Sequence, residues 1–142
     1  MNPLVILTGL VGAVAVAASC SAAPPPDHPI LGTWTLTPAN QSCTETYFFK
    51  SDGSTLVTSA EEVAESAYDI AAEPSDAGFY RYTDKITKDN GKKDCAGNVT
   101  PPGETSVNFI AFHRSGEMFV MCREESLEHC LGPFRRVHGE GS

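Results

Sequence analysis

From Pro29 onward, apolar and polar residues alternate in short runs, separated by turn-forming residues at intervals of roughly eight to fifteen positions. Alternation with a period of two places successive side chains on opposite faces and is typical of β-strands. This part of the chain contains no convincing long helix pattern. The sequence therefore predicts an all-β domain of about eight strands.

The expected strands follow from these runs. They are residues 30–37, 43–50, 55–59, 66–72, 78–87, 106–113, 117–123 and 133–137. Asp52-Gly53 is a strong hairpin signal, and residues 114–116 form a second hairpin turn. The Ala- and Glu-rich residues 61–65 are predicted as a turn or short helix, and residues 88–104 as a long polar loop.

The order of the strands predicts their closure into a barrel. Strands joined in up-and-down order leave two unpaired edges unless the sheet closes on itself. A chain of 142 residues has room for one domain of ordinary size. We therefore expect one antiparallel up-and-down β-barrel of about eight strands over residues 30–138, followed by a disordered tail at residues 139–142.

Two expected strands, VNFIAF and MFVMC, are apolar on both faces. Whichever face lines the core, Phe109 or Phe112, and Phe119 or Val120, lie on the other side of the sheet. We expect the long polar loop or the Ala- and Glu-rich segment to cover this outer face. Otherwise the face is a binding patch for a protein partner.

The N-terminal segment has the features of an export signal. Residues 4–18 are uncharged and mostly apolar, but shorter than the roughly 20 residues that cross a bilayer. Ala17-Ala18-Ser19 before Cys20 resembles the bacterial lipobox, after which a peptidase cleaves and the cysteine carries lipid. The alternative is ordinary cleavage near Ala22 or Ala23, which removes Cys20 from a secreted protein.

Under the lipobox interpretation, residues 1–19 are a signal peptide, and residues 20–29 are a palmitate-type lipid anchor with a proline-rich tether. The tether is expected to be extended as polyproline II. The protein is then attached through its N-terminal lipid to a membrane of the bacterial cell envelope. Ser21 and Ala22, directly after Cys20, do not include the Asp that often retains lipoproteins at the inner membrane, which favours the outer membrane.

The number of cysteines supports the same interpretation. Five cysteines are an odd number for an exported protein, and setting Cys20 aside leaves an even set of four. In an up-and-down barrel Cys43, Cys95, Cys122 and Cys130 fall at one end, where three pairings are open. We prefer Cys43 with Cys95 and Cys122 with Cys130, because the first pair restrains the long loop.

Charge limits the classes of partner. The formal net charge is −8, and every charged residue lies at or after Asp27, so the acidity belongs to the mature part. An acidic surface argues against binding to nucleic acid or to anionic lipid headgroups. A charged protein partner should therefore be basic.

The sequence contains no recognisable catalytic or metal-binding motif. Residues 128–130 (EHC) lack zinc-ligand spacing, and residues 88–94 lack the spacing of a calcium loop. His113 and His138 have no Ser or Cys nucleophile at a recognisable elbow. We therefore expect no cofactor, no metal and no enzymatic activity.

Gly32-Thr33-Trp34 in the first expected strand resembles the Gly-x-Trp signature of lipocalins. In that family the tryptophan closes the floor of the barrel, and an arginine from the last strand lies across it. The resemblance implies the same contact for Arg135 or Arg136, with a cation–π gain of about 0.5–2 kcal/mol. The chain thus resembles small bacterial lipocalin-like lipoproteins, which implies no particular ligand.

Large aromatic residues are expected inside the barrel, and they determine whether it has room for a ligand. The candidates for ligand contact are Tyr47, Phe49, Tyr68, Tyr80 and Tyr82. An eight-stranded barrel is wide enough either to be filled by side chains or to hold one small ligand. The leading hypothesis is binding of a small amphipathic or apolar ligand. The alternative is a filled barrel that serves as an inhibitor or immunity-type interaction module.

Overall fold

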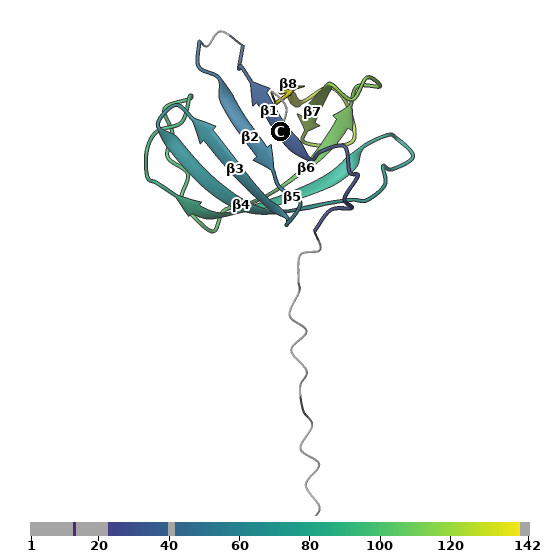
Figure 1. Ribbon diagram of the computed structural model, residues 1–142, viewed down its shortest axis with the longest axis horizontal. Coiled ribbons are helices and arrows are strands. Elements are labelled where there is room, and N and C mark those ends of the chain that lie inside the picture. Colours follow the sequence, from purple (N-terminus) through teal and green to yellow (C-terminus); the bar gives the residue numbers. More distant parts are fainter. Residues whose placement is uncertain (1–12, 14–22, 40–41, 140–142) are drawn as a thin grey trace, which may run out of the picture.

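A computed structural model of the protein describes residue 13, residues 23–39 and residues 42–139. These residues form eight antiparallel strands and no helix (Figure 1). The strands are β1 (Gly32–Leu36), β2 (Glu45–Phe49), β3 (Ser54–Ser59), β4 (Glu62–Ile70), β5 (Tyr80–Asp89), β6 (Thr105–Phe112), β7 (Met118–Cys122) and β8 (Cys130–Arg136). Each pairs with the next, and β8 pairs with β1. The predicted eight-stranded up-and-down barrel is confirmed.

β4 shows how the alternation builds the barrel wall. Its buried and exposed positions alternate along nearly the whole strand. The prediction of a turn or short helix at residues 61–65 holds only for residue 61, which lies in a turn, and was wrong for residues 62–65, which belong to this strand. The preference of Ala and Glu for helix amounts to tenths of a kcal/mol per residue. Pairing with β3 on one side and β5 on the other outweighs it.

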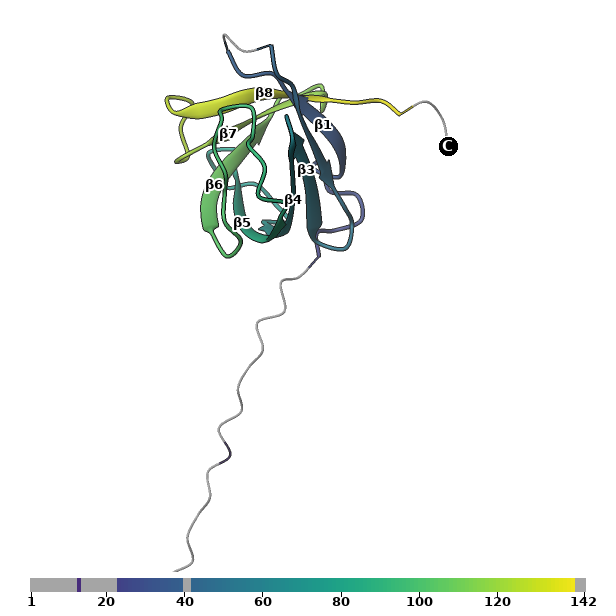
Figure 2. The same cartoon turned by 90° about the vertical axis from the view of Figure 1, so that its left-hand side faces the viewer.

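The chain connections divide the barrel into two ends, which Figure 2 shows from the side. At the end that we call the rim, loops join β1 to β2, β3 to β4, β5 to β6 and β7 to β8. The other end, the floor, holds the remaining connections. A Cys43–Cys95 disulfide and a Cys122–Cys130 disulfide both lie at the rim, so the preferred pairing is confirmed.

Aromatic rings fill the barrel toward the floor. The rings of Phe119 and Phe134 are stacked with centroids 4.4 Å apart, and Trp34 meets Phe119 edge-on at 4.7 Å. Phe49 meets Tyr68 at 5.5 Å in the same way. These separations are typical of favourable aromatic pairs. This part of the interior is therefore a packed hydrophobic core.

The residues just before β1 pack against the floor. Pro24 is buried, and the His28 N–H donates to the Pro25 carbonyl at 3.0 Å, which closes a turn. The extended conformation predicted for the whole tether is therefore wrong for residues 25–28. Burial of Pro24 and His28 against the floor stabilises the turn more than the prolines favour the extended polyproline II conformation. The expected signal peptide and Cys20 lie outside the described residues, apart from residue 13, as do residues 140–142 of the expected tail.

No helix among the residues that the structure describes is long and apolar enough to cross a membrane.

Candidate functional site

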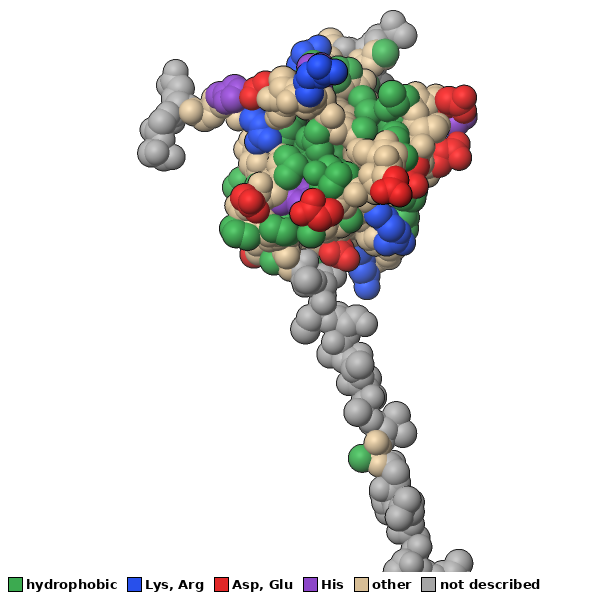
Figure 3. All heavy atoms as spheres, turned by 90° about the vertical axis from the view of Figure 1, so that its right-hand side faces the viewer, with side chains coloured by type: hydrophobic (Ala, Val, Ile, Leu, Met, Phe, Trp, Pro, Cys, Tyr) green, Lys and Arg blue, Asp and Glu red, His purple; other side chains and the backbone are tan. Residues whose placement is uncertain are grey.

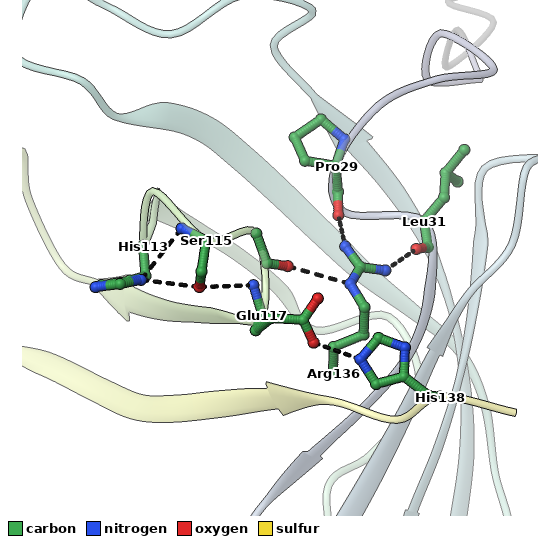
Figure 4. A network of polar contacts seen from close by, with 8 residues as sticks. Pro29, Leu31, His113, Ser115, Glu117, Arg136 and His138 are labelled. Atoms are coloured by element: carbon green, nitrogen blue, oxygen red, sulfur yellow. Dashed lines mark hydrogen bonds and ion pairs between the residues drawn. The ribbon is translucent and has the colours of Figure 1, made fainter.

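The floor is closed by a tryptophan from the first strand and an arginine from the last strand. The Arg136 guanidinium lies over the Trp34 ring, with its central carbon 4.2 Å from the ring centroid. Its nitrogens donate to the carbonyls of Pro29, Leu31 and Gly116 at 2.7, 2.9 and 3.1 Å (Figure 4). These bonds tie β8 to the N-terminal segment and to the β6–β7 hairpin.

The second arginine that the resemblance offered lies elsewhere. Arg135 is exposed, and its guanidinium contacts the Met118 sulfur at 3.2 Å. Successive strand residues point to opposite faces, so only one of two adjacent arginines can reach the Trp34 ring. The structure assigns that position to Arg136.

Gly32 in the Gly-x-Trp motif has a direct physical role. Its φ is +112°, a conformation that residues with a Cβ rarely adopt. A Cβ at this position would also lie 3.3 Å from a guanidinium nitrogen of Arg136. The motif therefore requires glycine so that the arginine can approach the backbone beside Trp34.

His28 is a buried residue at the floor that the sequence analysis did not single out. Its Nδ1 accepts the Ile30 N–H at 3.1 Å, so the proton resides on Nε2, which donates to the Ala71 carbonyl at 3.0 Å. Burial lowers the pKa of this imidazole below its ordinary value. Neutral His28 thus connects the N-terminal segment to the β4–β5 connection. A lone histidine between Asp27 and Pro29 gave no sequence signal for this role.

The five aromatic candidates all face the interior, where their rings contact one another or neighbouring aromatic side chains. Tyr47 stacks near Phe49, Phe49 and Tyr68 both contact Tyr82, and Tyr80 packs against Phe112 on the floor side. These contacts explain the positions of the rings without a bound ligand. Ligand contact by these five side chains stays a prediction.

Two interior tyrosine hydroxyls donate to carboxylates near the rim. Tyr47 donates to Glu45 at 2.6 Å, and Tyr82 donates to Asp84 at 2.9 Å. The pKa of both tyrosines is raised well above the ordinary value, mainly by burial and to a smaller extent by the nearby carboxylates. Burial also raises the pKa of Asp84. Both tyrosines therefore remain hydrogen-bond donors at physiological pH.

Acidic side chains line the interior near the rim. We call the carboxylates of Glu45, Glu62, Asp84 and Asp89 the rim carboxylates. Glu62 is buried, and burial together with a hydrogen bond to Asp89 raises the pKa of Glu62 to about 7. The ion pairs found in the described part of the chain, Lys88–Glu65 and His138–Glu117, include none of these four residues. The rim carboxylates thus lack a basic partner within the described structure.

The β5–β6 loop is attached to the rim beside these acids. The Ser59 hydroxyl donates to Glu45 at 2.8 Å and accepts the Cys95 N–H at 2.9 Å. The Asn90 side chain donates to the Glu61 carbonyl at 2.9 Å. Together with the Cys43–Cys95 disulfide, these bonds fix part of the loop over one side of the opening.

On the opposite side of the rim lies a hollow of about 540 Å³, which we call the mouth hollow. Its lining mixes apolar, amide and charged groups from Asn108, Met121, Arg123, Glu128, His129, Cys130 and Leu131. Asn108 pairs with Tyr82, and Met121 pairs with Ile110, both of which are buried in the core. Because paired residues share a face, the hollow opens on the inner side of the barrel wall.

A second hollow, the outer groove, lies on the outside of β6 and β7. It has a volume of about 400 Å³ and an almost wholly apolar lining of Ala111, Phe112, His113, Met118, Phe119, Val120, Leu127 and Pro133. Figure 3 shows apolar side chains gathered in patches among Asp and Glu on the side where β6 and β7 lie in Figure 1.

The outer face of these strands is not covered in the way that the sequence predicted. Residues 62–65 lie within β4, and the β5–β6 loop is fixed at the rim by Cys95. Phe112 and Phe119 face the core beside Trp34, which leaves Val120 toward the outer groove. The expected cover was wrong because strand pairing and the disulfide hold both segments elsewhere.

The remaining polar candidates have local roles. His113 bonds to the Ser115 hydroxyl within the β6–β7 turn, and His138 pairs with Glu117 (Figure 4). In the part of the chain that the structure describes, no group of three or more His, Cys, Asp or Glu is arranged to hold a metal ion.

Comparison of the chain with protein-family models, with curated protein sequences and with solved structures found no match. The class of protein must therefore be argued from the structure, which is a closed antiparallel barrel with Arg136 stacked on Trp34 at its floor.

Proposed function

We propose that this protein is a lipid-anchored, lipocalin-like binding protein of the bacterial cell envelope that takes a small amphipathic ligand at the mouth of its barrel. The anchor rests on the lipobox-like residues before Cys20 and on the even set of cysteines that remains without it. The lipocalin-like character is supported by the barrel and by the Trp34–Arg136 floor.

The mouth hollow is the observation that carries the binding proposal. Its volume of about 540 Å³ lies within the range of roughly 300–1,000 Å³ of small-molecule sites. Met121 and Leu131 offer apolar surface, while Asn108 and Arg123 offer hydrogen-bond donors. This combination suits a ligand with one apolar and one polar part. Aromatic packing nearer the floor leaves the mouth as the best position for it.

The experiment uses three single-chain amphiphiles that share a dodecyl tail. They are neutral dodecyl maltoside, cationic dodecyltrimethylammonium and anionic dodecylsulfonate, each titrated below its micelle concentration by calorimetry. We expect saturable one-to-one binding of at least one of them, since the shared tail can contact Met121 and Leu131. Absence of binding by all three would refute the proposal.

A matched pair of variants locates the binding. Leu131 and Val107 are both about half exposed, but only Leu131 lines the hollow. Val107 pairs with Thr83 on the outer face of the barrel. We expect Leu131→Asn to weaken binding several-fold and Val107→Asn to leave it unchanged. Equal effects of the two changes would place the ligand elsewhere.

The outer groove favours a second candidate function, the binding of a basic protein. Leu127 is 70% exposed beside the groove and belongs to a loop that also carries Glu124, Glu125 and Glu128. Exposed apolar surface next to acidic residues suits a partner with a large apolar side chain flanked by Lys or Arg. Pull-down from host envelope extract with the wild type and with Leu127→Asp tests this candidate, because the substitution should abolish capture of a basic protein.

A further inference from the structure

The rim carboxylates are acidic groups of the barrel interior that take part in none of the ion pairs of the described residues. Glu45 pairs with Ser59, and Ser59 pairs with Glu62, so these two acids occupy neighbouring inward-facing positions. Asp84 accepts the hydroxyl of the buried Tyr82 inside the same barrel. Asp89 lies beside Glu62 and pairs with Ala64 on the inner face of β4. Buried acids are normally paired with cations or lose their charge. Here hydrogen bonds from Tyr47, Tyr82 and Ser59 stabilise some of them.

A second observation points to a missing partner in the same place. Thr55 is 98% buried, since only 2% of its surface is exposed, and its hydroxyl oxygen has no hydrogen-bond partner in the described structure. It lies opposite buried Ser66 and beside the Tyr82 hydroxyl, whose own proton is donated to Asp84, so no group in the described structure donates to the Thr55 oxygen. A buried polar group without a hydrogen-bond partner is unfavourable, because it has lost its bonds to water and gained none in the protein. The polar interior therefore has an unused hydrogen-bonding group as well as unbalanced charge.

The mouth hollow adjoins this acidic interior. Asn108 lines the hollow and pairs with Tyr82. The next inward-facing pair toward the rim is Asp84 with Ser106, so Asp84 is a diagonal neighbour of Asn108. Diagonal neighbours on one face of a sheet lie within reach of each other's side chains. A head group held near Asn108 would therefore meet Asp84 first.

We propose that the polar head of the ligand is an organic cation, such as an ammonium group, which the rim carboxylates bind while its apolar part occupies the mouth hollow. This inference rests on the proposed function and specifies its ligand class. A metal ion is not the partner that the geometry favours, because no described cluster of ligating side chains is arranged for one. Arg123 and His129 are the basic residues lining the hollow, and both are exposed. Their exposure leaves the interior acidic.

The same dodecyl series tests the inference. We expect dodecyltrimethylammonium to bind about tenfold or more tightly than dodecyl maltoside, since its positive head can pair with the rim carboxylates and the neutral maltoside cannot. Dodecylsulfonate should bind most weakly. Binding of all three with equal affinity, or with the anion tightest, would overturn the inference and leave the proposed function intact. Binding of none would refute the proposed function itself.

A matched pair of substitutions separates the interior charge from the overall charge. Asp84→Asn removes a carboxylate from the inner face, and Asp69→Asn removes one from the exposed face of neighbouring β4. We expect the first to reduce affinity for dodecyltrimethylammonium about tenfold and the second to change it less than twofold. Affinity for dodecyl maltoside should be preserved in both, which also reports that the variants are folded. Equal losses in the two variants would overturn the inference.

The pH dependence gives an independent readout, because dodecyltrimethylammonium does not titrate. The groups that face the bound head are Glu45, Glu62, Asp84, Asp89 and the hydroxyls of Tyr47 and Tyr82. Glu62, whose pKa is raised to about 7, gains its charge as the pH rises through neutrality, and the pKa of Asp84 is also raised by burial. Affinity for the cation should therefore increase between pH 5 and pH 8, while dodecyl maltoside shows no such trend. A flat profile for the cation would contradict its contact with these acids.

Discussion

The guanidinium of Arg136 in the last strand lies 4.2 Å from the centre of the Trp34 ring in the first strand. This contact joins the two strands that close the barrel, where β1 and β8 pair directly through Trp34–Arg136 and Thr35–Arg135. Three backbone carbonyls complete the coordination of the guanidinium. The floor is therefore held by one planar cation with several fixed donors.

Arg136→Lys should lower the free energy of unfolding by about 1–3 kcal/mol, because lysine cannot reproduce the planar fork of donors. The measurement is urea denaturation followed by the fluorescence of the single tryptophan. Arg135→Lys is the matched control and should change stability by less than about 0.5 kcal/mol, since Arg135 is exposed. Similar losses in both variants would contradict the assignment of Arg136 to the floor.

Replacing Cys43 and Cys95 together by Ala should lower the free energy of unfolding by about 2–4 kcal/mol, because this disulfide closes a separation of 52 residues. Amide hydrogen exchange should become faster in residues 90–104. The Cys122 and Cys130 double variant is the control, since it removes a closure of only 8 residues and leaves that loop attached. Unchanged protection of residues 90–104 in the first variant would show that the disulfide does not hold the loop.

Glu62 should make the barrel less stable as the pH rises from about 4.5 to about 7. Its pKa is about 7 in the folded protein against an ordinary value of 4.5, so the folded state binds the extra proton throughout this window. Glu62→Gln should remove this decline in thermal midpoint, and Glu61→Gln, which changes an exposed neighbour, should retain it. A decline of the same size in Glu62→Gln would mean that another group is responsible.

His28 should make the barrel less stable as the pH falls, which is the opposite of the effect of Glu62. Because burial lowers the pKa of His28 in the folded state, the unfolded chain binds more protons as the pH falls below about 6.5. Stability should therefore fall on acidification, and more in the wild type than in His28→Gln, whose amide can still donate to the Ala71 carbonyl. Thermal melts between pH 7.5 and pH 5 measure this difference. The exposed His113→Gln variant should follow the wild type, and a steeper loss in His28→Gln would contradict the neutral imidazole.

If the proposed lipid anchor is attached at Cys20, Cys20→Ser should move the protein from the membrane fraction to the soluble fraction of a bacterium that expresses it, because the lipid would have no thiol to attach to. Metabolic labelling with an alkyne fatty acid should mark the wild type and not the variant. Ser21→Ala is the control and should remain labelled and membrane-bound. Retention of the serine variant in membranes would count against the lipid anchor.

The alternating pattern was sufficient to predict the class of fold, since strand periodicity, hairpin turns and the need to cover edges are local or general properties. Trp34 was indicated by the resemblance of Gly32-Thr33-Trp34 to the lipocalin signature, and the observed cysteine pairing was the preferred one of three that the connection order left open. The local pattern misassigned residues 62–65, because the pairing partners that make β4 a strand are distant in sequence. Helix propensity was the only local signal there.

The sequence by itself determined a closed, acidic β-barrel with cysteines grouped at one end, because alternation, charge and connection order are written along the chain. Only the tertiary structure decided which arginine covers Trp34, that His28 is buried at the floor, and that Thr55 and the rim carboxylates lie on the inner face of the barrel. Each of these depends on side chains from strands far apart in sequence meeting across the barrel. Their separation and burial are set by strand register and closure, which no local pattern specifies.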